Sequence, residues 1–104
     1  MSSIFSDIPN SISEEIFEDI VSTENIRIER ILSHGHSSPD VGWHDQSENE
    51  WVIVLKGQGV IEFESGEICA LSEGDYLNIK AGVKHKVLST AADEVTVWLA
   101  IFYS

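Results

Sequence analysis

The feature that most limits the fold of this chain is a succession of short apolar or alternating segments, each separated from the next by a turn sequence. From Asn25 onward no segment sustains the 3.6-residue period of an amphipathic helix. Glycines in the intervening turns adopt positive φ at little cost. We expect eight strands, at residues 26–32, 42–46, 51–55, 59–64, 68–71, 76–79, 85–89 and 95–103. The pattern predicts an all-β chain folded as a closed or double-sheet barrel.

The start of the chain carries a different signal. Ser11 precedes Glu14 by three residues, as in a helix capping box, and Ile12, Ile16 and Ile20 follow at fourfold spacing. This spacing predicts a short helix in an N-terminal extension, residues 1–25, ahead of a barrel that occupies residues 26–104.

The length of 104 residues fits one domain with one hydrophobic core. Predicted strands such as residues 51–55 and 97–102 are apolar on both faces. One face can fill the barrel, but the other needs cover from more protein. We therefore expect a single domain, residues 1–104, that forms a homodimer.

The charge balance narrows the choice of partners. The chain has 18 Asp and Glu residues against 6 Lys and Arg residues, a formal net charge of −12. Nucleic acids and anionic membrane surfaces both bind clustered basic side chains, so we expect neither as a partner. We expect a cytoplasmic protein, since no signal peptide or membrane span is recognisable and Cys69 is the single cysteine.

Side chains suited to metal binding or acid–base chemistry are concentrated around the four histidines, His34, His36, His44 and His85. Gln46 follows His44 by two residues, so both side chains would project to one face of a strand. Glu50 begins the next predicted strand and can return its carboxylate to that face. Barrel closure would bring His85 from a distant strand to the same place.

Two stretches of the sequence resemble the motifs of the cupin superfamily. The first motif normally reads His-x-His, three or four residues, Glu, six residues, Gly, and its counterpart here is His44, Gln46, Glu50 and Gly57. The second normally reads Gly-Asp, four residues, Pro-x-Gly-x-x-His, and its counterpart is Gly74, Asp75, Gly82 and His85. The resemblance runs from about Ile26 to Tyr103. It is closest to small single-domain bacterial cupins of unassigned function.

The resemblance implies a cupin double-stranded β-helix, a jelly-roll barrel, that holds one divalent transition metal. The implied ligands are His44, Gln46, Glu50 and His85, and the metals that suit them are iron, manganese, nickel and zinc. Gln46 replaces the second motif histidine and is a weaker donor. The other three ligands still form a two-His, one-carboxylate set with open positions for a small-molecule ligand or substrate. Lys80 also replaces the motif proline, and Ser89 stands near a frequent asparagine.

Several interpretations remain open at this stage. Gln46 either ligates the metal or hydrogen-bonds to the barrel wall, and His34 and His36 either belong to a loop or support the ligands from behind. The functional alternatives are a metal-dependent enzyme, with dioxygenase or isomerase chemistry, a non-catalytic module that binds a small ligand, and a metal-free structural cupin. The sequence contains no recognisable substrate-binding motif.

Overall fold

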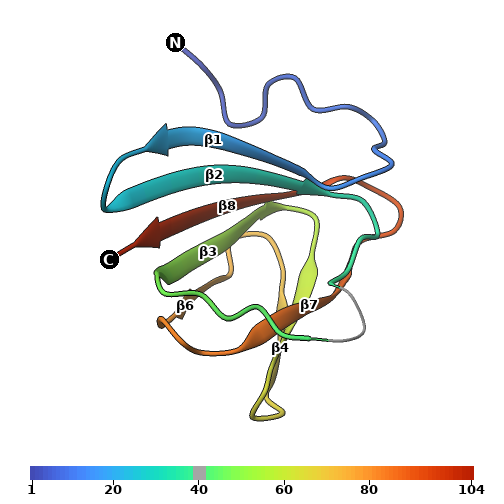
Figure 1. The fold of residues 1–104 in the computed structure, drawn as a ribbon. Coiled ribbons are helices and arrows are strands. Elements are labelled where there is room, and N and C mark those ends of the chain that lie inside the picture. Colours follow the sequence, from blue (N-terminus) through green and yellow to red (C-terminus); the bar gives the residue numbers. More distant parts are fainter. Residues whose placement is uncertain (39–41) are drawn as a thin grey trace.

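The computed structural model describes residues 1–38 and 42–104, and within them the regular structure is entirely β (Figure 1). The strands are β1 (Ile16–Ser22), β2 (Ile26–Ser33), β3 (Asn49–Lys56), β4 (Gly59–Phe63), β5 (Ile68–Leu71), β6 (Tyr76–Ile79), β7 (His85–Thr90) and β8 (Thr96–Tyr103). The predicted all-β class is confirmed. Among these described residues, none forms a helix long and apolar enough to cross a membrane.

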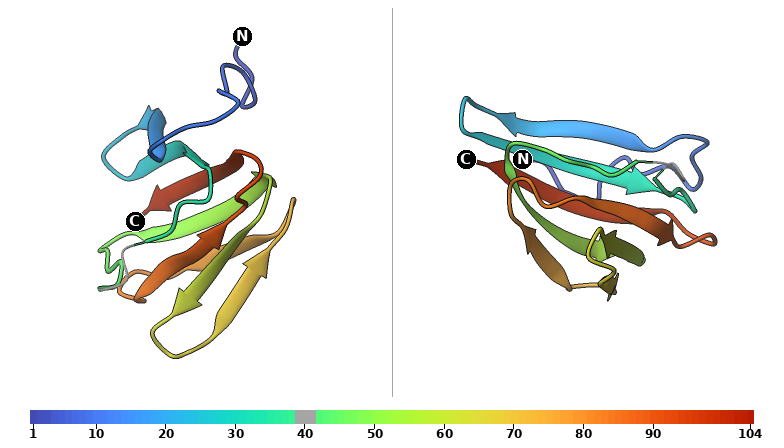
Figure 2. Two further views of the ribbon diagram at one scale, coloured as in Figure 1. Left: turned by 90° about the vertical axis from the view of Figure 1, so that its right-hand side faces the viewer. Right: turned by 60° about the horizontal axis from the view of Figure 1, so that its bottom comes forward.

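The strands form two antiparallel sheets that face each other. The larger sheet has the order β1-β2-β8-β3-β6, and the smaller has the order β5-β4-β7. Strands distant in sequence are therefore neighbours, such as β2 with β8 and β4 with β7, as the two views of Figure 2 also show. This is the arrangement expected of a jelly-roll barrel.

The main core lies between the sheets and is centred on β8. Trp98 is 4% exposed and belongs to one core cluster with Val52 of β3, Ile61 of β4 in the smaller sheet and Phe102 of β8 itself. Gly59 makes this packing possible, because a Cβ atom at that position would lie 2.2 Å from the indole ring of Trp98. The absence of a side chain in β4 thus lets the indole lie against the smaller sheet.

The predicted N-terminal helix is wrong, because β1 occupies part of that segment. Ile16 pairs with Leu32 and Ser22 pairs with Arg27, so β1 extends the larger sheet at its β2 edge. An isolated helix of this length is marginal in water, whereas pairing satisfies the backbone groups of β2 and suits β-branched residues such as Ile16. Tertiary pairing thus overrides the fourfold spacing.

The predicted strand at residues 42–46 is also wrong. His44 forms only an isolated bridge with His85, in which His44 N donates to His85 O at 2.7 Å and His85 N donates to His44 O at 3.2 Å. The flanking residues Gly42 and Asp45 are exposed, and Gly42 has a φ of 98°. This conformation interrupts an extended ladder and leaves His44 in an irregular segment beside β7.

Candidate functional site

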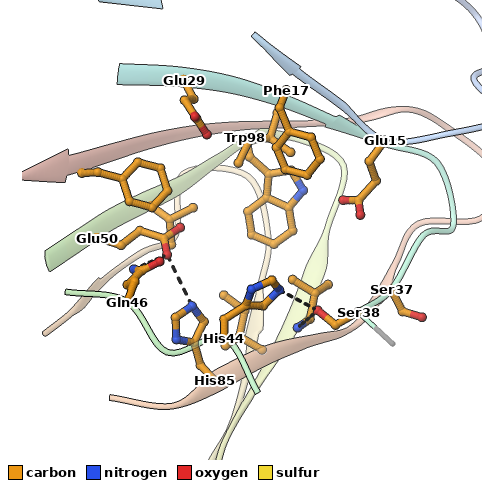
Figure 3. A pocket seen from close by; sticks show the side chains of 15 residues that line it. Glu15, Phe17, Glu29, Ser37, Ser38, His44, Gln46, Glu50, His85 and Trp98 are labelled. Atoms are coloured by element: carbon orange, nitrogen blue, oxygen red, sulfur yellow. Dashed lines mark hydrogen bonds and ion pairs between the residues drawn. The ribbon is translucent and has the colours of Figure 1, made fainter. Parts of the chain in front are cut away.

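A cavity of about 230 Å³ lies between the two sheets. Its apolar walls include Ile31, Val52, Val87 and Trp98. Its polar lining includes the four side chains that the sequence singled out, His44, Gln46, Glu50 and His85 (Figure 3). The structure therefore places all four predicted site residues on one cavity.

Glu50 and His85 face each other across the gap between the two sheets. Glu50 lies in β3, where it pairs with Phe102 of β8, and His85 begins β7, where it pairs with Phe63 of β4. The Nε2 atom of His85 is 3.3 Å from Oε1 of Glu50, and their side chains are only 6% and 12% exposed. Barrel closure thus brings together two residues of the predicted set that are far apart in the sequence.

The orientation of His85 is fixed by a backbone carbonyl. Its Nδ1 lies 3.0 Å from the carbonyl oxygen of Val83, which can only accept, so Nδ1 carries a proton. Burial lowers the pKa of His85, but hydrogen bonds to Glu50 and Val83 outweigh burial and raise that pKa above 6.5. A neutral His85 would present a lone pair to the Glu50 carboxylate. A proton or another cation is therefore needed between Nε2 and Oε1.

Gln46 adjoins this pair, whereas His44 is turned aside. The Nε2 of Gln46 donates to Oε1 of Glu50 at 3.1 Å. The Nε2 of His44 instead lies 3.3 Å from the hydroxyl of Ser38, and the His44 ring centroid is 5.8 Å from that of His85. Among the described residues, no three His, Cys, Asp or Glu side chains converge closely enough to hold a metal ion. The four expected ligands thus lie near one another, but their donor atoms do not converge on a single position for a metal ion.

Ser38 explains the orientation of His44. The Ser38 hydroxyl oxygen accepts a hydrogen bond from the backbone nitrogen of Val87 at 2.9 Å. Its own proton is then free to be donated to Nε2 of His44. Sequence reasoning had assigned no role to Ser38, although its place just before Pro39 in a loop near the histidines was a usable signal.

His34 and His36 support the loop and not the cavity. The backbone nitrogen of His34 donates to Nδ1 of His36 at 2.8 Å, and Nε2 of His36 then donates to the carbonyl oxygen of Ser13 at 3.1 Å. Neither histidine is among the described residues that line the cavity. These contacts tie the loop after β2 to the N-terminal segment.

The N-terminal segment and the first two strands add residues to the cavity that the sequence did not indicate. Glu15, Phe17 and Glu29 all line it. Burial raises the pKa of Glu29, Arg27 lowers it and Asp19 raises it, with a net upward shift. Glu15 and Phe17 lie in the segment that the sequence predicts as a helix, and it is the pairing of β1 with β2 that brings them to the cavity.

Comparison with known proteins gives a consistent result. A family model described as "Cupin domain" matches residues 28–102. The chain is 35% identical to a protein from Ralstonia eutropha JMP134 called a "putative mannose-6-phosphate isomerase", with a TM-score of 0.96 over 100% of this chain and 97% of that one. No curated protein matches the sequence.

Two more distant solved structures share the fold. One is an RmlC-like cupin family protein with a double-stranded β-helix fold from Methanocaldococcus jannaschii, 18% identical, with a TM-score of 0.72 over 93% of this chain and 86% of that one. The other is a DMSP lyase from Ruegeria pomeroyi, 14% identical, with a TM-score of 0.72 over 86% of this chain and 47% of that one. At these identities the likeness concerns the fold alone.

Proposed function

The chain belongs to the cupin family, with the all-β double-stranded β-helix fold, and we propose that it is a small metal-binding cupin. In this proposal the cavity holds one divalent transition metal and leaves room beside it for a small-molecule ligand or substrate. The observation that carries the proposal is the Glu50–His85 pair. The Nε2 atom of His85 and a carboxylate oxygen of Glu50 lie 3.3 Å apart in a largely buried site, so a cation between them would meet two donor atoms.

The chemistry of these donors fits a divalent metal. A backbone carbonyl that holds Nδ1–H and directs Nε2 to the site is the usual support of a metal-binding histidine. Val83 supplies that carbonyl to His85. A cation between Nε2 and the Glu50 carboxylate would satisfy both without a second proton on His85. Imidazole and carboxylate together suit iron, manganese, nickel or zinc.

Gln46 and His44 would complete the ligand set after rotation of both side chains. The amide of Gln46 contacts Glu50 through its nitrogen, and a half-turn about its last side-chain bond would present the oxygen instead. His44 would exchange its contact with Ser38 for the metal. A bound metal would act as a Lewis acid toward a ligand oxygen. Trp98 and Val52 would keep bulk water from the opposite wall.

A metal-free ligand-binding cupin is the second candidate, and one observation favours it. The side chains of Gln46, Glu50 and His85 already satisfy one another when His85 is protonated. Such a closed network needs no metal to be stable. The cavity would then bind a small ligand without catalysing a reaction.

Among enzymatic reactions, the resemblance to a protein named as an isomerase supports isomerase over dioxygenase chemistry. We do not propose the phosphorylated substrate in that protein's name as a ligand of this chain. None of the described residues that line this cavity is Arg or Lys, whereas Glu15, Glu29 and Glu50 are all acidic. A phosphate group would meet negative charge without a basic partner.

We also propose a homodimer in the cytosol. Ile20, Val21 and Ile26 are large apolar side chains at the β1–β2 edge of the larger sheet, and all are exposed. A second copy of this chain would cover them, as patches of this kind commonly mark interfaces. The single cysteine, Cys69, is free, in keeping with a reducing compartment.

Elemental analysis tests the metal proposal directly. The protein should be purified from its own host without an affinity tag or added nickel. We expect about one equivalent of iron, manganese, nickel or zinc per chain, in line with a site of this ligand chemistry. Protein that contains no such metal and acquires none on titration would favour the metal-free candidate.

A further inference from the structure

Glu15 places a carboxylate on the cavity, across from the candidate metal ligands (Figure 3). It directly precedes β1, and its Oε2 accepts a hydrogen bond of 2.9 Å from the hydroxyl of Ser33. Ser33 is 1% exposed, so this contact is anchored in the packed interior. Glu15 is therefore held in position by β2 and not simply carried on a free segment.

Glu15 is the cavity carboxylate whose charge is left uncompensated. Glu50 faces His85, which supplies a proton or shares a cation with it. Glu29 is paired with Arg27 at 3.0 Å. Glu15 forms no ion pair with any residue in the described ranges 1–38 and 42–104. Its only side-chain partner there is the neutral hydroxyl of Ser33.

The walls around this charge are apolar and partly aromatic. Phe17, Ile31, Val87 and Trp98 all line the same cavity. An uncompensated carboxylate beside apolar walls attracts a cation more strongly than it would in open water. Aromatic rings such as those of Phe17 and Trp98 add a further attraction for an ammonium group.

We infer that the cavity takes a small organic amine, with its ammonium group toward Glu15 and its apolar body between the aromatic and aliphatic walls. The inference rests on the proposed function in one respect, since it takes the same cavity as the ligand site. It goes further by assigning a ligand charge and a specificity-determining residue that belongs to neither cupin motif.

Benzylamine and benzyl alcohol are suitable probes, because they are nearly equal in size and differ in charge at neutral pH. Their affinities should be measured by NMR titration against the wild-type protein and the Glu15→Gln variant, both used as purified from the protein's own host. The amide oxygen of the variant can still accept the hydrogen bond from Ser33. We expect wild-type protein to bind benzylamine about tenfold more tightly than the alcohol, and the variant to bind the two within about twofold.

Glu14→Gln is the matched control. Glu14 is exposed, adjacent to Glu15 in sequence and not among the described residues that line the cavity. The Glu14→Gln substitution therefore removes the same charge from the same segment. This variant should keep the wild-type preference for benzylamine. An equal loss of preference in both variants would overturn the inference, because the effect would then come from the net charge of the protein.

The inference is also overturned if benzylamine does not bind, or if folded Glu15→Gln protein retains the wild-type preference. Metal content measured on the same samples separates this result from the proposed function. Protein without metal that still prefers the amine through Glu15 would contradict the metal proposal and support the amine site. Protein that contains metal but shows no preference for benzylamine would support the metal proposal and overturn the amine site.

Discussion

The Nε2 atom of His85 lies 3.3 Å from Oε1 of Glu50, while the other ring nitrogen of His85 donates to the carbonyl of Val83. In the proposed function, a proton and a metal ion would therefore compete for one position. When the proton is present, the pair is an imidazolium and a carboxylate. When the proton leaves, His85 offers a lone pair to any cation in the cavity. The pH should therefore affect the metal-free and metal-loaded proteins in opposite directions.

The first prediction concerns the stability of the metal-free protein. The pKa of folded His85 is raised above 6.5, so between 6.5 and the raised value the folded state holds more protons than the unfolded state. The free energy of unfolding should consequently fall as the pH rises through that window. Urea denaturation in the presence of a chelator, at about pH 6 and about pH 8, would measure this change.

Glu50→Gln provides the control for this pH effect, because it removes the carboxylate that favours the protonated imidazole. The fall in stability with rising pH should shrink in the variant, whereas the contribution of general charge repulsion is nearly unchanged. Metal affinity of the wild-type protein should rise over the same interval, since Nε2 must lose its proton to bind. Equal pH dependence in wild type and variant would show that the pair does not control it.

The second prediction concerns Gln46. Replacing it with His restores the usual residue of the first cupin motif and exchanges an amide donor for a stronger imidazole donor. Gln46 already contacts Glu50 at 3.1 Å, so a histidine there should tighten metal binding by about tenfold or more. Competition with a coloured chelator would measure the change. Asp45→His is a matched control on an exposed neighbour and should give no gain.

Most of the barrel could be predicted from the sequence because alternation and turn glycines are local signals. The strands β5 and β6 match their predicted ranges, and β3, β4, β7 and β8 differ only at their ends. The N-terminal helix failed for a tertiary reason. A stretch with isoleucines at fourfold spacing is also rich in β-branched residues, and pairing with β2 decides between the two.

The sequence predicted that the side chains of the candidate site would lie close together, but it could not predict all of the contacts between them and their neighbours. The cupin motifs correctly indicated that Glu50 and His85 would meet. They could not indicate that His44 is turned toward Ser38, because that contact depends on Ser38 binding β7 at Val87. The position of Glu15 on the cavity could not be predicted for a similar reason, since it depends on a hydrogen bond from the buried hydroxyl of Ser33.

The third prediction compares how much Trp98 and Trp51 each contribute to the free energy of unfolding. Trp98 is buried against Gly59, whereas Trp51 is partly exposed and packs on Tyr76, with ring centroids 5.3 Å apart. Trp98→Ala should cost about 3–5 kcal/mol in the free energy of unfolding, and Trp51→Ala clearly less. Urea denaturation compares the two variants. Equal losses would contradict the expectation that the deeper burial of Trp98 sets the larger cost.

The fourth prediction concerns the homodimer. Sedimentation equilibrium at micromolar concentration should give about twice the chain mass of 11.6 kDa. Ile20→Glu combined with Val21→Glu should shift the protein toward monomer, because both side chains lie in the exposed edge strand β1. Ile68→Glu alters an equally exposed residue of the smaller sheet and should leave the dimer intact. A wild-type mass near that of one chain would refute the dimer.

The central claim is that the barrel residues, and not the neighbouring loop histidines, hold the metal. Metal titration of four proteins tests it most directly: wild type, His85→Ala, His44→Ala, and the double variant His34→Ala with His36→Ala. We expect tight binding by wild type and almost none by His85→Ala or His44→Ala. The double variant should lose about tenfold to a hundredfold at most, because the imidazole of His36 binds the loop and the N-terminal segment and neither histidine is among the described residues that line the cavity. Tight binding that survives the loss of His85 but disappears with His34 and His36 would contradict the account.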